Sequence, residues 1–111
     1  MAITHIVLFQ FQQGTNTEKI EELSSRFLAL KHECLSVATQ KPYILSVKGG
    51  IDNSPEGAQN GITHGFIVEF ETPEDRDYYV DNDPAHQEFK KLAGKIREKA
   101  IVVDFASGVF K

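Results

Sequence analysis

The chain has 111 residues, a formal net charge of −4 and a single cysteine, Cys34. This length fits one domain over residues 1–111, and no linker or repeat marks a second one. An acidic chain without a lysine or arginine run is not typical of nucleic-acid or anionic-membrane binding, and one cysteine excludes an internal disulfide. We expect a cytoplasmic domain without a signal peptide or a membrane span.

The first half of the chain predicts a strand, a helix and a second strand. Residues 4–12 are rich in β-branched and aromatic side chains, and one face of this strand carries His5, Val7, Phe9 and Phe11. A capping box of Thr15 and Glu18 predicts a helix start. The helix that follows has an apolar stripe at spacings of three and four: Ile20, Leu23, Phe27, Leu30, Cys34 and Val37. Residues 43–50 predict a shorter strand, followed by a surface loop.

The second half predicts a third strand, an interrupted helix and a last strand. Residues 63–71 alternate and place on one face His64, Phe66, Val68 and Phe70. "TPED" begins a helix at Pro73. After a break near Asn82, "DPAH" begins the helix again, with Asp83 as its cap. Residues 100–106 predict a strand in which Val102 alternates with Ile101, Val103 and Phe105.

This order of elements is the βαββαβ pattern of ferredoxin-like α+β folds, in which an antiparallel sheet carries its helices on one face. The first and last strands are apolar on both faces, so the uncovered face would leave a large apolar patch in water. A second copy of the same sheet would bury that patch. We therefore expect a homodimer through this face, with the C-terminal "SGVF" reaching across as an arm.

Four segments, in this order and at this spacing, resemble the stress-responsive dimeric α/β barrel (A/B barrel) family. They are "THIVLFQF", "SPEG" with "GITHGFIVEF", "DYYV" with "DPAHQEF", and "VVDFASGVF". The resemblance covers nearly the whole chain and implies two ferredoxin-like protomers that form a dimeric α+β barrel. Family members include plant heat-stable stress proteins and a polyketide cyclase of the olivetolic acid type, which carries out an intramolecular aldol condensation. Because one fold hosts many chemistries, the fold alone assigns no activity.

His86 has two interpretations. It follows the cap Asp83 by three residues and continues a stripe with Phe89, Ala93 and Ile96. In the structural interpretation, it is a partly buried histidine that hydrogen-bonds a backbone carbonyl or a carboxylate. In the catalytic interpretation, it is a neutral general base in a pocket between helix and sheet. The resemblance to the cyclase implies a tyrosine partner from the preceding helix, which maps to Tyr78 or Tyr79.

The other site residues follow from the same resemblance. His5 is the expected companion of Tyr78 and His86, whereas His64 starts an antiparallel neighbouring strand and belongs at the other end of the sheet. The family cavity lies on the helix-covered side, where we expect ligand contacts from Val7, Phe9, Phe27, His64, Phe66, Val68, Tyr79 and Phe89. Asp83 and His86 are too few ligands for a metal site, and no cofactor motif is present.

Two functional hypotheses remain at this point. The first is a homodimeric stress-response protein that binds a small apolar or carbonyl-rich ligand between sheet and helices. The second is an acid–base enzyme of polyketide-cyclase type, with His86 as base, Tyr78 as proton donor and His5 as an orienting group. An open cavity that reaches both His86 and a tyrosine hydroxyl would favour the enzyme.

Overall fold

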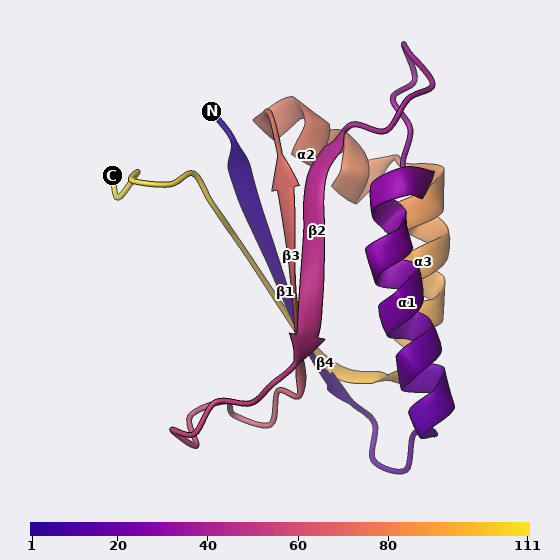
Figure 1. Ribbon diagram of the computed structural model, residues 1–111, viewed down its shortest axis with the longest axis vertical. Coiled ribbons are helices and arrows are strands. Elements are labelled where there is room, and N and C mark those ends of the chain that lie inside the picture. Colours follow the sequence, from indigo (N-terminus) through magenta and orange to yellow (C-terminus); the bar gives the residue numbers. More distant parts are fainter.

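The computed structural model describes residues 1–111, and its helices all lie on one side of a four-stranded sheet (Figure 1). The alternating and helical patterns of the sequence become seven elements: β1 (Ile3–Phe11), α1 (Thr17–Glu33), β2 (Ile44–Ile51), β3 (His64–Phe70), α2 (Pro73–Asp81), α3 (Pro84–Ile96) and β4 (Arg97–Phe105). None of the three helices combines the length and the apolar character that a membrane span requires.

The strands pair in the order β2-β3-β1-β4, and every pair is antiparallel. This is the ferredoxin-like α+β fold, as the order of elements predicts. In this register His5 lies opposite Val68 on one side and Asp104 on the other. His64 lies opposite Phe9, so the two strand histidines occupy different ends of the sheet, as expected.

The two helices after β3 begin where the sequence predicts. The hydroxyl of Thr72 accepts a hydrogen bond from the backbone N–H of Asp75 (3.1 Å), and Pro73 occupies the first turn of α2. Asp83 accepts from the backbone N–H groups of Ala85 and His86 at the start of α3. The predicted break is confirmed, because Asn82 caps the end of α2 and directly precedes the N-cap of α3.

The predicted ends of α1 are wrong. Asn16, not Thr15, is its N-cap, since the Asn16 side chain accepts from the backbone N–H of Glu18 (2.6 Å). Asparagine is among the best N-cap residues, and here it replaces the predicted box of Thr15 and Glu18. The helix ends at Glu33, so Val37 leaves the apolar stripe and is exposed.

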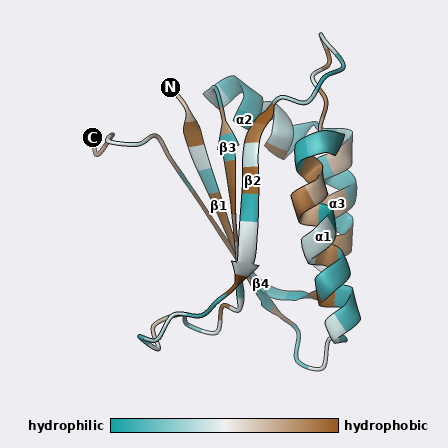
Figure 2. Cartoon of the chain, viewed as in Figure 1, coloured by the Kyte–Doolittle hydropathy of each residue, from teal (hydrophilic) through white to brown (hydrophobic).

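A closed aromatic core lies between α1 and the sheet. The rings of Phe27 and Phe66 stack with their centroids 4.2 Å apart, and only 1% and 2% of these residues remain exposed. Gly49 on β2 leaves room for this packing, because a Cβ at that position would overlap the ring of Phe66. Figure 2 shows the apolar residues along the strands and on the sheet-facing side of α1. Burial of these side chains stabilises the α1 side of the fold.

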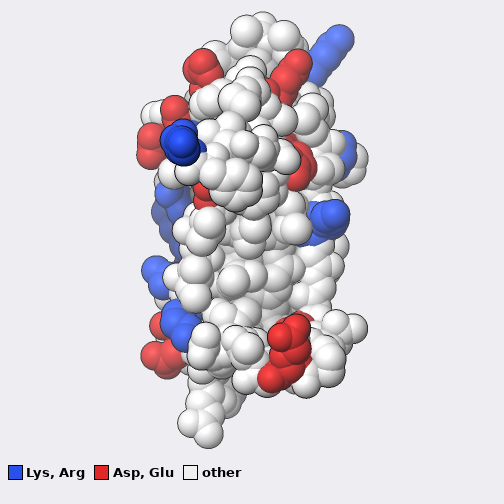
Figure 3. Space-filling view, turned by 90° about the vertical axis from the view of Figure 1, so that its left-hand side faces the viewer, with Lys and Arg blue, Asp and Glu red and all other residues white.

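The opposite face of the sheet is uncovered and mostly apolar. Figure 3 shows a broad area without charge on this side, with charged side chains mainly toward its margins. The register places six apolar side chains there: Ile6, Leu8, Ile67, Ile101, Val103 and Phe105. Beyond β4, the penultimate residue Phe110 is 95% exposed. A patch of this kind marks an interaction surface in soluble proteins.

Candidate functional site

A cavity of about 340 Å³ lies between α3 and the strands β1 and β4. Its wall is mostly apolar, and the two imidazoles in it come from His5 and His86. The apolar wall residues are Val7, Phe9, Phe27, Val80, Phe89, Ala93, Ala100 and Val102. The size and lining are typical of a site for a small molecule. Four of the residues expected to contact a ligand thus line this cavity: Val7, Phe9, Phe27 and Phe89.

His86 has both the carbonyl partner and the cavity position that its two interpretations require. Its Nδ1–H donates to the backbone carbonyl of Tyr79 (2.7 Å), and its ring stacks on the Tyr79 ring with centroids 3.8 Å apart. Because Nδ1 carries the proton, Nε2 is left as a hydrogen-bond acceptor. Burial, opposed by the Tyr79 carbonyl, lowers the pKa of His86 to about 4, so the ring is neutral at pH 7.

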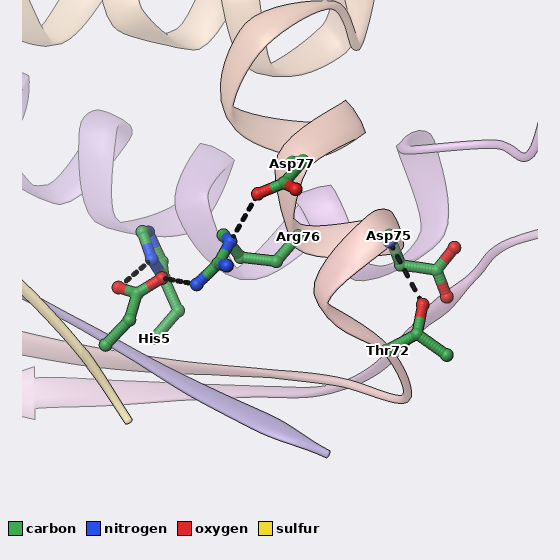
Figure 4. A network of polar contacts seen from close by, with 6 residues as sticks. His5, Thr72, Asp75, Arg76 and Asp77 are labelled. Carbon is green, nitrogen blue, oxygen red and sulfur yellow. Dashed lines mark hydrogen bonds and ion pairs between the residues drawn. The ribbon is translucent and has the colours of Figure 1, made fainter. Parts of the chain in front are cut away.

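His5 is held by a carboxylate that the sequence analysis did not assign to the site. His5 Nδ1 lies 2.7 Å from Asp104 Oδ1, and Arg76 donates to Asp104 Oδ2 (2.8 Å). Figure 4 shows His5 and Arg76 on either side of this carboxylate. Arg76 also donates to Asp77 (2.7 Å). The hydrogen bond to Asp104 raises the pKa of the Arg76 guanidinium. The carboxylate fixes the His5 ring and leaves Nε2 as its free nitrogen.

The two tyrosines of α2 lie in different places, and neither lines the cavity. Tyr79 is fully buried beneath His86, and its hydroxyl has no hydrogen-bond partner. Burial raises the pKa of this hydroxyl. Tyr78 is half-buried and packs edge-on against Tyr43, with centroids 5.8 Å apart. Successive helical residues point about 100° apart, so only one of the pair faces His86, and it is Tyr79.

The remaining candidates lie outside the cavity. His64 packs edge-on against Phe11 at the other end of the sheet, and burial lowers its pKa. Phe66 and Val68 belong to the closed core. His32 is exposed, as the pattern of α1 predicts.

Buried polar groups surround the start of α3. Asp83 is 1% exposed, and its Oδ2 accepts a hydrogen bond from the Tyr43 hydroxyl (2.6 Å). Its Oδ1 accepts from the backbone N–H of Ala85 (2.9 Å). Cys34 is also buried, and desolvation raises the pKa of its thiol well above the ordinary value. We find no group of three or more His, Cys, Asp or Glu side chains arranged to hold a metal ion.

Solved structures with the same fold come from plants and bacteria. The At3g17210 protein of Arabidopsis thaliana is 29% identical, with 98% of each chain covered and a TM-score of 0.80. The hydroxynitrile lyase of Passiflora edulis is 21% identical, with 99% of this chain and 97% of the lyase covered and a TM-score of 0.80. A dimeric ferredoxin-like protein of Jannaschia is 19% identical, with 96% and 99% covered and a TM-score of 0.75. The similarities to the lyase and to the Jannaschia protein show a shared fold only.

The sequence comparisons assign the family. The family model described as the stress responsive A/B barrel domain matches residues 3–107. The stress-response A/B barrel domain-containing protein HS1 of Arabidopsis thaliana is 31% identical over 103 residues, which cover 93% of this chain and 87% of HS1. The chain therefore belongs to the stress-responsive A/B barrel family.

Proposed function

We propose that this protein is a homodimer whose cavity between α3 and the sheet binds a small, largely apolar molecule with enolisable carbonyl groups. One observation carries the proposal: an apolar cavity of about 340 Å³ has two oriented imidazoles in its wall. Pockets with apolar walls and a few fixed polar groups are the usual form of a small-molecule site.

The imidazoles define the polar part of such a ligand. His86 uses its Nδ1–H on the Tyr79 carbonyl, so its neutral ring offers only an acceptor at Nε2. A matching ligand group is a hydroxyl or an enol, which a carbonyl-rich molecule supplies by enolisation. Without that donor, the ligand would bury the nitrogen unpaired and lose affinity.

A binding experiment tests the ligand class. We expect 2,4-nonanedione, which enolises and has an apolar tail, to bind saturably in calorimetric titrations. Ala93→Phe fills the cavity and should weaken binding by at least about tenfold, because the ligand and the new ring compete for one space. Val102→Phe, at a half-exposed wall position, repeats the test without crowding the interior. The exposed Ala38→Phe is the matched control. No saturable binding to the wild type would reject the proposal.

The dimer is proposed on the uncovered sheet face. Its support is the apolar patch that includes Ile6, Val103 and Phe105, the apolar C-terminal arm, and the dimeric state of the similar Jannaschia protein. Val103→Glu should convert the dimer to monomer in sedimentation at micromolar concentration, since a buried unpaired charge is costly. The matched control is Val37→Glu, an exposed position outside this face. A wild-type monomer under these conditions would exclude this assembly.

A second candidate function uses the same cavity for acid–base chemistry. The observation that favours it is the His5–Asp104 pair, which has the arrangement of a base oriented by a carboxylate. His86, with a pKa of about 4, is a weaker base than an ordinary imidazole. Tyr78 lies outside the cavity wall, so the geometry favours His5 over Tyr78 as the partner of His86. The hydroxynitrile lyase of Passiflora edulis shares this fold.

Turnover assays separate the two functions. If the cavity is catalytic, His5→Gln and His86→Gln should each reduce turnover of a linear polyketide-like substrate by about 10²- to 10⁴-fold. Tyr78→Phe tests whether the tyrosine outside the cavity wall contributes. Saturable binding without any turnover above the uncatalysed rate would leave the protein a binding protein.

A further inference from the structure

The charged side chains in the cavity wall are both cationic. They belong to Lys90 on α3 and Arg97 at the start of β4. No aspartate or glutamate lines the cavity, although the chain has 16 acidic and 12 basic residues. The local charge is therefore opposite in sign to the net charge of the protein. An apolar cavity that has only cations among its charges is suited to a ligand with a negative group.

Both cations have hydrogen-bond donors without a partner within the chain. Arg97 makes no side-chain ion pair with any acidic group of the chain, and its guanidinium makes no hydrogen bond within it. Lys90 donates one hydrogen bond to the carbonyl of Val80 (2.9 Å), which leaves two of its three hydrogens free. Elsewhere, Arg76 and Lys91 are paired with carboxylates.

The two cations stand at the mouth of the cavity. Lys90 and Arg97 are exposed, whereas His5, Phe9 and Phe89 in the same wall are buried. A molecule with its apolar part among these buried side chains would therefore hold a terminal charged group beside the ammonium and the guanidinium. A guanidinium recognises a carboxylate through two parallel hydrogen bonds, and the ammonium adds a second positive charge.

We propose that the ligand of this cavity is an amphiphilic carboxylate, with its acid group held at the mouth by Lys90 and Arg97 and its apolar body inside. This inference rests on the proposed binding function and adds the charge of the ligand. The enol or hydroxyl group that His86 accepts from lies deeper, so the ligand class is a hydroxy or oxo acid with an apolar chain.

The test compares two probes that differ in one group. Octanoate and 2-nonanone carry the same unbranched alkyl chain on their carbonyl carbon. Where octanoate has its second carboxylate oxygen, 2-nonanone has a methyl group. At low ionic strength we expect octanoate to bind the wild type about tenfold more tightly than 2-nonanone, because charge-assisted hydrogen bonds are the stronger kind. Raising the salt concentration should reduce only the affinity for octanoate.

Variants locate the effect at the two cations. The double variant Lys90→Met with Arg97→Met should bring the two affinities within about twofold of each other by weakening the binding of octanoate, because methionine keeps the apolar stems and removes the charges. Lys95→Met is the matched control: it lies on the same helix, is exposed and does not line the cavity, so octanoate should keep its advantage.

The possible failures are distinguishable. Saturable binding of 2-nonanone without an advantage for octanoate would overturn the carboxylate inference and leave the proposed binding function standing. Absence of binding for octanoate, while 2,4-nonanedione binds saturably, would overturn the carboxylate inference alone. Absence of binding for both octanoate and 2,4-nonanedione would overturn the inference and the proposed binding function. Tighter binding of octyl phosphate than of octanoate, lost in the double variant, would assign a phosphate-bearing ligand and overturn the carboxylate assignment.

Discussion

Beneath α1 the helix-covered face of the sheet is filled by stacked aromatic rings, whereas beneath α3 the same face leaves a cavity of about 340 Å³. The residues explain the difference. Phe27 and Phe66 meet ring to ring in the closed part. At the cavity, α3 and β4 contribute the small side chains of Ala93 and Ala100. One sheet thus supports a packed core at one edge and a space at the other.

This contrast indicates which part of the molecule is built for stability and which for binding. Protein interiors pack as densely as organic crystals, so an unfilled space forfeits contacts that larger side chains would supply. The cavity also contains imidazoles and cations, which an interior built only for stability would exclude.

The largest effect is expected in the closed core. Phe66→Ala removes a ring that is stacked on Phe27 and should lower the free energy of unfolding by about 3–5 kcal/mol. Val102→Ala, in the cavity wall and 55% exposed, should lower it by less than about 1 kcal/mol. Urea denaturation monitored by circular dichroism measures both. Equal losses would contradict the division between core and cavity.

A pH-dependent loss of stability is expected from His86. Burial lowers the pKa of His86 from 6.5 to about 4. Between pH 6.5 and pH 4 the unfolded chain therefore binds a proton at this residue, whereas the folded protein does not. The contribution of the neutral His86 ring to the unfolding free energy is fully present above pH 6.5, and it is lost as the pH falls through 4. Between pH 7 and pH 4 the wild type should lose about 2–3 kcal/mol more unfolding free energy than His86→Gln. Parallel pH profiles for the two proteins would show that the ring is not held neutral.

Smaller effects separate the three tyrosines. Tyr43→Phe removes the donor to the buried Asp83 and should cost about 1–3 kcal/mol, because it leaves a carboxylate oxygen unpaired. Tyr78→Phe should change stability by less than about 0.5 kcal/mol. Tyr79→Phe should be neutral or stabilising, since its buried hydroxyl has no partner to lose. Thermal unfolding of the three variants checks this order, and a large loss for Tyr79→Phe would contradict it.

Most of the fold follows from periodicity and helix-start residues. Alternation in residues 3–11 and 64–70 requires strands with one buried face, and Pro73 and Pro84 mark helix starts because proline fits only the first turn. The ends of α1 were harder to predict. Asn16 and Thr15 are both good caps, and the choice between them depends on how the chain leaves β1.

The site was predictable only where a residue follows a helical or strand period. His5 and His86 follow such periods and share the cavity wall. Asp104 is in phase with Val102 and faces the helices, a signal that alternation alone could have revealed. Its pairing with Arg76 joins β4 to α2 and depends on tertiary packing. Which of Tyr78 and Tyr79 faces His86 depends on how α2 is rotated before the break at Asn82. No spacing rule in the sequence determines this rotation.

The central claim is that small molecules bind beneath α3 and not elsewhere, and a methyl-resolved NMR titration tests it most directly. With 2,4-nonanedione we expect saturable shifts for methyl groups in the cavity wall, those of Val7, Ala93 and Val102. Ile44 in the closed core and Val103 on the uncovered face should not shift. Saturable shifts centred on Val103, or none at all for the cavity methyl groups, would contradict the account.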